Sequence, residues 1–356
     1  STSCLYFGAE DAMRTRYPRE INLYYNMTGP EALNDENIGA LRNAVYRTAA
    51  DAHGEVKNVA DWRSVSAVGY INGTEVETDR DVVYDVQWVG EVENVCTFYF
   101  VPLADYNNMT GANETLEDGE AMISLHRTTY TGDVISFTRG ERYTIKKQVD
   151  EFAANDEISS DITATIIIVV PDLLKAVSRL YEYQSEHAGI RLMSRWQFGF
   201  DTGLDEAAEK EVYLAMRDIL CGPEFEEEYS VKSRSVEWRT AESEDFYATY
   251  GGFFYLGIIL SIVFIFAAVL IIYYKQISEG YEDQSRFRIM QNVGMTKTEI
   301  RKSINSQLLT VFFLPLAFAG LHLAFAFPII NKLLWLFNFS NIPLFIGTTL
   351  ASFAVF

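Results

Sequence analysis

The strongest constraint on the fold is an apolar run, GFFYLGIILSIVFIFAAVLIIYY, which occupies residues 252–274 and contains no charged side chain. As an α-helix these 23 residues would be roughly 34 Å long, enough to cross a hydrocarbon core of about 30 Å. Tyr255, Tyr273 and Tyr274 lie near its ends, where amphipathic rings favour the membrane–water interface. The run predicts a transmembrane helix; a helix buried in a protein core is the alternative.

Two further apolar segments follow, at 304–330 and 342–356. The first is long enough to span a bilayer, and Pro315 inside it predicts a kink because proline removes one backbone donor. His322 lies in the middle of this span, either as a functional group or as a neutral, hydrogen-bonded side chain. The second segment has only fifteen residues, which indicates a truncated transmembrane helix.

The segment between the first two spans, residues 275–303, predicts how the chain is oriented. It holds six basic and four acidic residues, a net charge of +2. Short basic loops face the cytoplasm, so we expect a multi-pass protein of the cell membrane with residues 1–247 and the loop 331–341 outside the cell. The sequence starts at Ser1 and stops within an apolar run, so we also expect a piece of a longer protein, with residues 1–17 as an entry strut from an upstream span.

The charge of the first part of the chain excludes one class of partner. The residues before Lys275 carry 22 basic and 45 acidic groups, a net charge of −23. Because affinity for phosphate comes from lysine and arginine, such a surface would repel nucleic acid. Acidic clusters at 224–229 and 150–157 could attract a cationic peptide or could be ordinary solvated surface.

Residues 1–247 mix strand and helix patterns, which predicts an α+β domain attached to an α-helical transmembrane domain. In 21–25, Ile21, Leu23 and Tyr25 alternate to one face of a strand. Further strands are expected at 95–101, 162–170 and 190–198, and helices at 36–52, 172–189 and 204–220. Residues 221–250 join this domain to the membrane, either as a stalk or as a plain linker.

The sequence shows no motif that predicts catalysis, metal binding or a disulfide framework. There is no G-x-x-x-x-G-K-[ST], so the residues present do not predict ATP binding through a P-loop, and no catalytic or metal-binding signature occurs. The cysteines at positions 4, 96 and 221 form no C-x-x-C pair. A disulfide framework is not predicted; one bridge between Cys96 and Cys221 is the alternative.

The polar segment QSRFRIMQNVGMTKTEIRKS, residues 284–303, predicts two helices separated by a tight break. Phe287, Met290 and Val293 recur at three-residue steps and give one apolar stripe on a polar helix. Gly294 suits a left-handed helix stop. The next residues, TKTE, predict a capping box at the start of the second helix, with Met295 and Ile300 at the two staple positions around it.

This connector could lie on lipid headgroups, pack against other loops of the same protein or dock a partner. The stretch YYKQISEGYEDQSRFRIMQNVGMTKTEIRKSI resembles the segment that follows the large outside domain of FtsX-like ABC permeases, most closely the bacitracin-efflux (BceB-type) permeases of Gram-positive bacteria. The positions that carry the resemblance are Arg286, Phe287, Ile289, Gly294, Met295 and Thr296. Residues 105–123 resemble a passage of the outside domains in this family.

The resemblance implies a permease subunit that has no catalytic activity of its own. ATP and Mg²⁺ would bind a separate cytoplasmic ABC ATPase, and no cofactor or metal site is expected in this chain. Its membrane spans would contact lipid, and the outside domain would engage a cationic antimicrobial peptide or its complex with a lipid target; a sensor histidine kinase is a further implied partner. The residues expected to couple to the ATPase are Arg286, Phe287, Ile289, Met290, Val293, Gly294, Met295, Thr296 and Glu299.

Two other functions stay open. A mechanotransmitting permease could activate a cell-wall hydrolase or export a lipid or lipoprotein, although the outside domain of such hydrolase activators is normally smaller than the segment 1–247. An enzyme or receptor unrelated to ABC transport is the third class. The lack of a catalytic pattern argues against an enzyme, and a pure receptor would not need a rigid cytoplasmic connector.

Overall fold

The computed structural model divides the chain into two compact units, residues 10–245 (unit 2) and residues 246–356 together with 1–9 (unit 1). The residues described are 17–79, 94–150, 152, 164–186, 192–222, 225, 228–336, 343, 346, 347 and 350. Residues 1–16 of the expected entry strut, most of the third apolar run, most of the acidic cluster 150–157 and half of the cluster 224–229 therefore lie outside the described residues.

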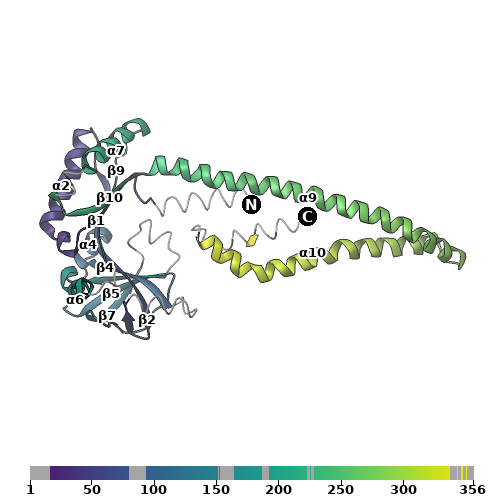
Figure 1. Cartoon of the computed structure of the whole chain (residues 1–356), viewed down its shortest axis with the longest axis horizontal. Helices are drawn as coiled ribbons and strands as arrows, with labels where there is room; N and C mark the ends of the chain where they lie inside the picture. Colours follow the sequence, from purple (N-terminus) through teal and green to yellow (C-terminus); the bar gives the residue numbers. More distant parts are fainter. Residues whose placement is uncertain are drawn as a thin grey trace. The chain divides into compact units, whose positions relative to one another are not determined.

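Unit 2 combines a large mixed sheet with helices, which confirms the predicted α+β content (Figure 1). Its strands are β1 (Ile21–Met27), β2 (Lys57–Asn72), β3 (Glu75–Glu77), β4 (Val95–Pro102), β5 (Glu120–His126), β6 (Val134–Phe137), β7 (Arg142–Val149), β8 (Ala164–Val170), β9 (Met193–Asp201) and β10 (Val231–Trp238). Its helices are η1 (Pro30–Leu33), α2 (Asp35–Asp51), α4 (Leu103–Thr110), α6 (Leu173–Glu186) and α7 (Glu206–Leu220).

Local patterns account for most of these elements. The alternating residues Ile21, Leu23 and Tyr25 of β1 are each fully buried, as predicted. The apolar stripe of α2 is buried, and the side chain of Asn34 caps its first turn by accepting a hydrogen bond from the Asn37 amide at 2.8 Å. In β8 every residue after Ala164 is buried, which confirms a strand covered on both faces.

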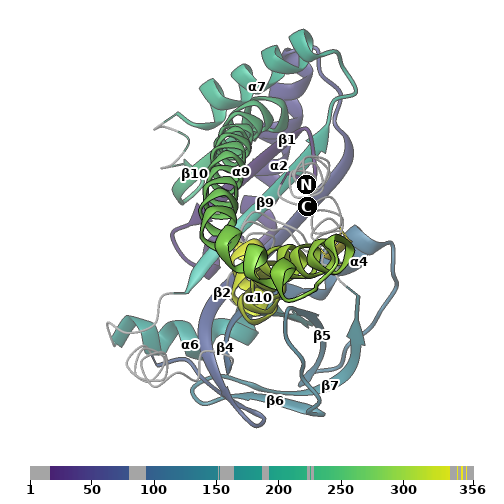
Figure 2. The same cartoon turned by 90° about the vertical axis from the view of Figure 1, so that its right-hand side faces the viewer.

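The long strand β2 joins two parts of the sheet (Figure 2). Its first half, from Lys57 to Ser66, pairs with β9, whereas Val65 to Tyr70 pair with β4 and the end of the strand pairs with β3. The order β2-β3-β6-β7-β5-β8-β4 then returns to β2, so these seven strands close into a ring. Strands β9, β1 and β10 extend the sheet outward from β2.

Gly69 permits the ring to close at the end of β2. A Cβ atom at this position would lie 2.8 Å from Cγ1 of Val76 and 3.1 Å from the carbonyl oxygen of Glu77, both on the facing strand β3. Any larger residue would therefore push β3 away from β2. The glycine is required by the close approach of two backbones.

One apolar core runs through unit 2. Helix α7 packs on α2 and β10, and α6 packs on β4 and β2, whereas Tyr106 of α4 packs in a separate apolar cluster with Met122 and Val169. Aromatic side chains fill the ring beneath α6, with Phe137 5.3 Å from Phe98 and 5.0 Å from Phe100 between ring centroids. Because this core includes both the ring and its extension, unit 2 is a single packed body.

Cys96 is buried in β4 and Cys221 is half-buried at the end of α7, and both are free thiols. The Cys96–Cys221 bridge that the sequence left open is therefore not formed.

Residues 221–250 supply a strand and the start of a helix. Val231 to Trp238 form β10, which pairs antiparallel with β1, and α9 (Arg239–Asn292) begins at the next residue. The described residues of this segment that precede α9 therefore belong to unit 2.

Two long helices contain the predicted membrane spans. The run 252–274 lies inside α9, and 304–330 lies inside α10 (Lys297–Leu336), which continues through both Pro315 and Pro328. Each helix is long and apolar enough to cross a membrane, and none of the qualifying segments is buried in the structure. Exposed apolar helices of this length are the form expected of lipid-facing spans.

Candidate functional site at the junction of α9 and α10

Helix α9 ends in a C-terminal capping motif that contains a glycine. Gly294 has a φ of +105°, its amide donates to the carbonyl of Gln291 at 3.1 Å, and the amide of Met295 donates to the carbonyl of Met290 at 3.1 Å. These two hydrogen bonds are those of a Schellman motif, with Gly294 at the left-handed position. The predicted glycine stop is confirmed. No atom lies within 4 Å of a Cβ built on Gly294, so only the backbone conformation demands glycine.

The start of α10 is the predicted capping box. The carboxylate of Glu299 accepts hydrogen bonds from the Thr296 amide at 2.9 Å and from the Thr296 hydroxyl at 2.8 Å. In return the Glu299 amide donates to the Thr296 hydroxyl at 3.4 Å. The bond from the backbone amide, followed by that from the hydroxyl, lowers the pKa of Glu299.

The two motifs leave little freedom between the helices. Only residues 293–296 separate α9 from α10, and Met295, which donates a hydrogen bond of the Schellman motif, directly precedes the capping residue Thr296. Hydrogen bonds within each helix end order the last turn of α9 and the first turn of α10. The connector (residues 284–303) is therefore a structured turn.

Apolar side chains of the connector are largely exposed. Val293 is 81% exposed and Ile289 is 63% exposed, and Met290 and Met295 are also classed as exposed. Phe287 of the predicted stripe is half-buried, whereas Met290 and Val293 are exposed. Exposed apolar groups on a polar helix end favour contact with another surface, either protein or lipid.

The polar side chains predicted to couple to the ATPase each have a partner close by in the sequence. Arg286 is exposed and pairs with Asp283 at 3.2 Å one turn earlier on the same helix. Thr296 and Glu299 are occupied by the cap. These side chains shape the connector, and the apolar ones remain available to a partner.

A broad hollow of about 1280 Å³ lies along the end of α9 and reaches Ile304 of α10. Phe287 and Ile289 of the predicted set line it, together with Ile277 and Tyr281. The sequence reasoning did not single out Ile277 and Tyr281, although their four-residue spacing places them on one helix face and could have indicated it.

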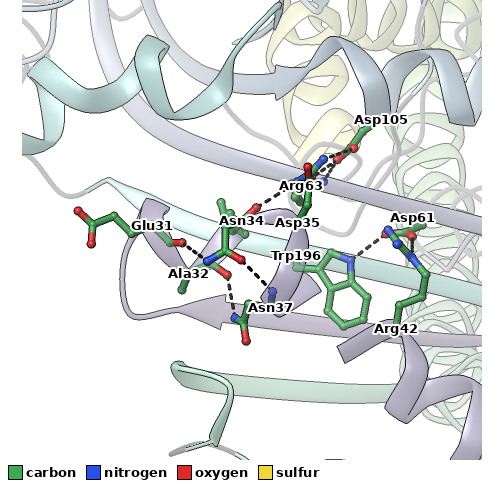
Figure 3. Close-up of polar contacts among 11 residues, drawn as sticks. Glu31, Ala32, Asn34, Asp35, Asn37, Arg42, Asp61, Arg63, Asp105 and Trp196 are labelled. Atoms are coloured by element: carbon green, nitrogen blue, oxygen red, sulfur yellow. Dashed lines mark hydrogen bonds and ion pairs between the residues drawn. The ribbon is translucent and has the colours of Figure 1, made fainter. Parts of the chain in front are cut away.

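The segment 105–123 forms helix α4, a turn and strand β5, and its first residue is held in a buried ion pair (Figure 3). Asp105 accepts hydrogen bonds from Nε of Arg63 at 3.0 Å and from Nη2 of Arg63 at 2.8 Å. Arg63 also donates to Asp35 at 2.6 Å and to the carbonyl of Leu33 at 3.1 Å. One guanidinium thus fastens α4 and the start of α2 to β2.

Among the described residues, no group of three or more His, Cys, Asp and Glu side chains is placed to hold a metal ion.

Comparison with known proteins agrees with this geometry in the C-terminal part. Residues 258–356 match the family described as FtsX-like permease C-terminal, a segment that holds the apolar part of α9, the connector and α10. The matched segment contains most of the first candidate membrane span and the whole of the second.

One similar protein is the ABC transporter permease protein YxdM of Bacillus subtilis (strain 168). It is 32% identical over 72 residues, which make up 20% of this chain and 12% of the length of YxdM. The chain therefore matches only about 12% of the length of this curated relative.

Proposed function

We propose that this chain is part of the permease subunit of an FtsX-like ABC transporter. The observation that carries the proposal is the family match over residues 258–356, because it includes the structured connector, most of the first candidate span and all of the second. In this proposal the connector binds a separate cytoplasmic ATPase, which holds ATP and Mg²⁺. Unit 2 lies on the opposite, extracellular side of the membrane, which agrees with the net charge of +2 in residues 275–303.

The proposed mechanism is mechanical. Closure of the ATPase subunits around ATP would displace the connector, and the short, hydrogen-bonded turn would carry that displacement into α9 and α10 without absorbing it. Because α9 begins directly after β10, its movement has a path into unit 2. The residues proposed to face the ATPase are the exposed apolar ones, chiefly Ile289, Met290 and Val293.

The proposed substrate is a cationic antimicrobial peptide or its complex with a lipid target, in a system of resistance and sensing that includes a sensor histidine kinase. The support is electrostatic: residues before Lys275 carry a net charge of −23, which attracts cations and raises their rate of encounter. The resemblance of the connector to BceB-type permeases points the same way.

The first test is co-purification of the full-length permease with its ATPase in mild detergent. Val293→Asp places a charge on the most exposed apolar side chain of the connector. Loss of one well-packed contact of about 1.4 kcal/mol would weaken the association about ten-fold. We expect Val293→Asp to raise the dissociation constant about ten-fold and so to reduce the recovered ATPase.

The matched control is Ile219→Asp, which alters an apolar side chain that is 53% exposed on α7 in unit 2. It should leave the recovered ATPase unchanged. Equal recovery from the Val293 variant and the wild type would remove the connector from the interface. Absence of any ATPase from the wild-type preparation would overturn the proposal as a whole.

A further inference from the structure

The helix that enters the membrane part has no loop at its origin in unit 2. Strand β10 ends at Trp238, α9 begins at Arg239, and β1 still pairs Ile21 with Trp238. The amide of Arg239 donates to the carbonyl of Glu20 at 2.9 Å, so the hydrogen-bonded ladder continues to the first helical residue. At such a junction the helix can rotate relative to the strand only through the φ and ψ torsions of the residues at the junction.

The side chain at this join is held by α7. Trp238 is 6% exposed, and its ring stacks on Tyr213 with centroids 5.6 Å apart and planes 24° apart. Its indole Nε1 donates a hydrogen bond of 2.7 Å to Oε1 of Glu209, which is also 6% exposed. A stacked ring with a directed hydrogen bond fixes both the position and the rotation of the indole.

The surroundings of the join are tied to the same place. The carboxylate of Glu20 accepts hydrogen bonds from the amide of Thr202 at 2.6 Å, its hydroxyl at 2.9 Å and the amide of Gly203 at 3.2 Å. These bonds anchor the turn between β9 and α7 beside the first residue of α9. Within the first turn of α9, Glu242 accepts a hydrogen bond of 3.4 Å from the Tyr17 hydroxyl.

Burial of Glu209 costs more free energy than burial of an apolar residue of similar size. A buried carboxylate loses its hydration, and an apolar residue of similar size would fill the same volume without that cost. The structure retains a charged acceptor where the indole N–H needs one. The arrangement therefore indicates that the directional hydrogen bond between Glu209 and Trp238, and not apolar packing alone, holds the indole in place.

We infer that Glu209, Tyr213 and Trp238 form a root clamp that passes the movement of α9 to the sheet of unit 2. The root clamp rests on the proposed function, because it matters only if α9 moves during the ATP cycle. A helix displaced at its far end moves a sheet only when its near end cannot turn freely. The clamp removes that freedom at the one residue where strand becomes helix. Glu209 and Tyr213 are thus positioning residues that act through Trp238.

The test uses the full-length permease with its ATPase in lipid nanodiscs. Amide hydrogen exchange of β1 and β9 is measured without nucleotide and with Mg·ATP plus vanadate. Trp238→Phe removes the N–H but keeps an aromatic ring, and Glu209→Leu removes the acceptor. We expect both variants to lose most of the nucleotide-dependent change in exchange while ATP hydrolysis continues.

Two matched variants separate coupling from general stability. Glu209→Gln keeps a carbonyl acceptor and should restore the wild-type response. Trp196→Phe removes the same kind of bond elsewhere in unit 2, where the Trp196 indole donates to Asp61 at 2.8 Å, and should respond like the wild type.

The outcomes are distinct. A wild-type response in Trp238→Phe and Glu209→Leu would overturn the root clamp but leave the proposed function standing. An equal loss in Trp196→Phe would also overturn the clamp, because the effect would then be one of stability. If the wild type itself shows no nucleotide-dependent change in unit 2, the proposed function fails and the root clamp fails with it.

Discussion

At the scale of single residues, the half-buried Arg63 and the buried Asp105 of unit 2 are paired with each other. The side chains of Arg63 and Asp105 are 13% and 8% exposed, and each nitrogen of the guanidinium has an oxygen within 3.1 Å. Such pairs add little net stability over an apolar pair, but removal of one partner strands the other charge. The pair therefore specifies how α4, α2 and β2 meet.

Glu209 gives a prediction of pH dependence. Burial, the largest effect, raises its pKa; Glu20 and Asp201 raise it further, while Trp238 and Arg239 lower it. A raised folded pKa means that the stability contributed by this group is complete below its unfolded pKa of about 4.3. The contribution is lost as the pH rises through the folded value.

Glu209→Gln removes this titration but keeps an acceptor for Trp238. We therefore expect the variant to gain stability relative to the wild type as the pH rises from about 4.3 through the folded pKa, and the difference then to level off. Thermal unfolding of both chains in detergent across this range measures it. A difference that is the same at every pH would contradict the assignment of a raised pKa to Glu209.

At the scale of elements, the turn between α9 and α10 depends on one backbone conformation. Gly294→Val should strain the left-handed position by about 1–2 kcal/mol and loosen the turn, because Val has a Cβ branch and Gly294 has a φ of +105°. We expect ATP hydrolysis by the partner to continue while resistance of the host cells to a cationic peptide antibiotic falls.

Gly73→Val is the matched control, because Gly73 also has a positive φ, +66°, and also has no atom within 4 Å of a built Cβ. It lies in the turn between β2 and β3, away from the connector. It should cost similar stability without separating hydrolysis from resistance. Unchanged resistance in the Gly294 variant would show that the turn does not couple the two.

At the scale of the whole molecule, the uneven distribution of charge along the chain gives a prediction about ligand binding. The net −23 before Lys275 predicts that a cationic peptide binds the full-length chain in nanodiscs of neutral lipid and that added salt weakens the binding. The same peptide with its lysines acetylated is the control and should bind less tightly, with little dependence on salt. Equal affinity for both peptides would rule out electrostatic attraction as the basis of recognition.

The sequence by itself determined the features that depend on near neighbours. The candidate span at 252–274 follows from the length of an uncharged apolar run. The stripe of α2, the Gly294 stop and the Thr296–Glu299 cap follow from side-chain period or from hydrogen bonds within five residues. Local geometry decides such features wherever the segment lies. The exposure of the connector side chains, which differs between Phe287 and Val293, could not be predicted in this way.

Only the tertiary structure decided which distant parts meet. The ring closes because β2 pairs with both β3 and β4, and the sheet extends beyond the ring because β2 also pairs with β9. Residues 231–238 form a strand because they pair with the edge of β1. The pair Arg63–Asp105 and the contact of Glu209 with Trp238 join residues 42 and 29 positions apart. Their pairing depends on the packing of the whole sheet, because no pattern within one segment carries information about the edge or pocket that it will meet.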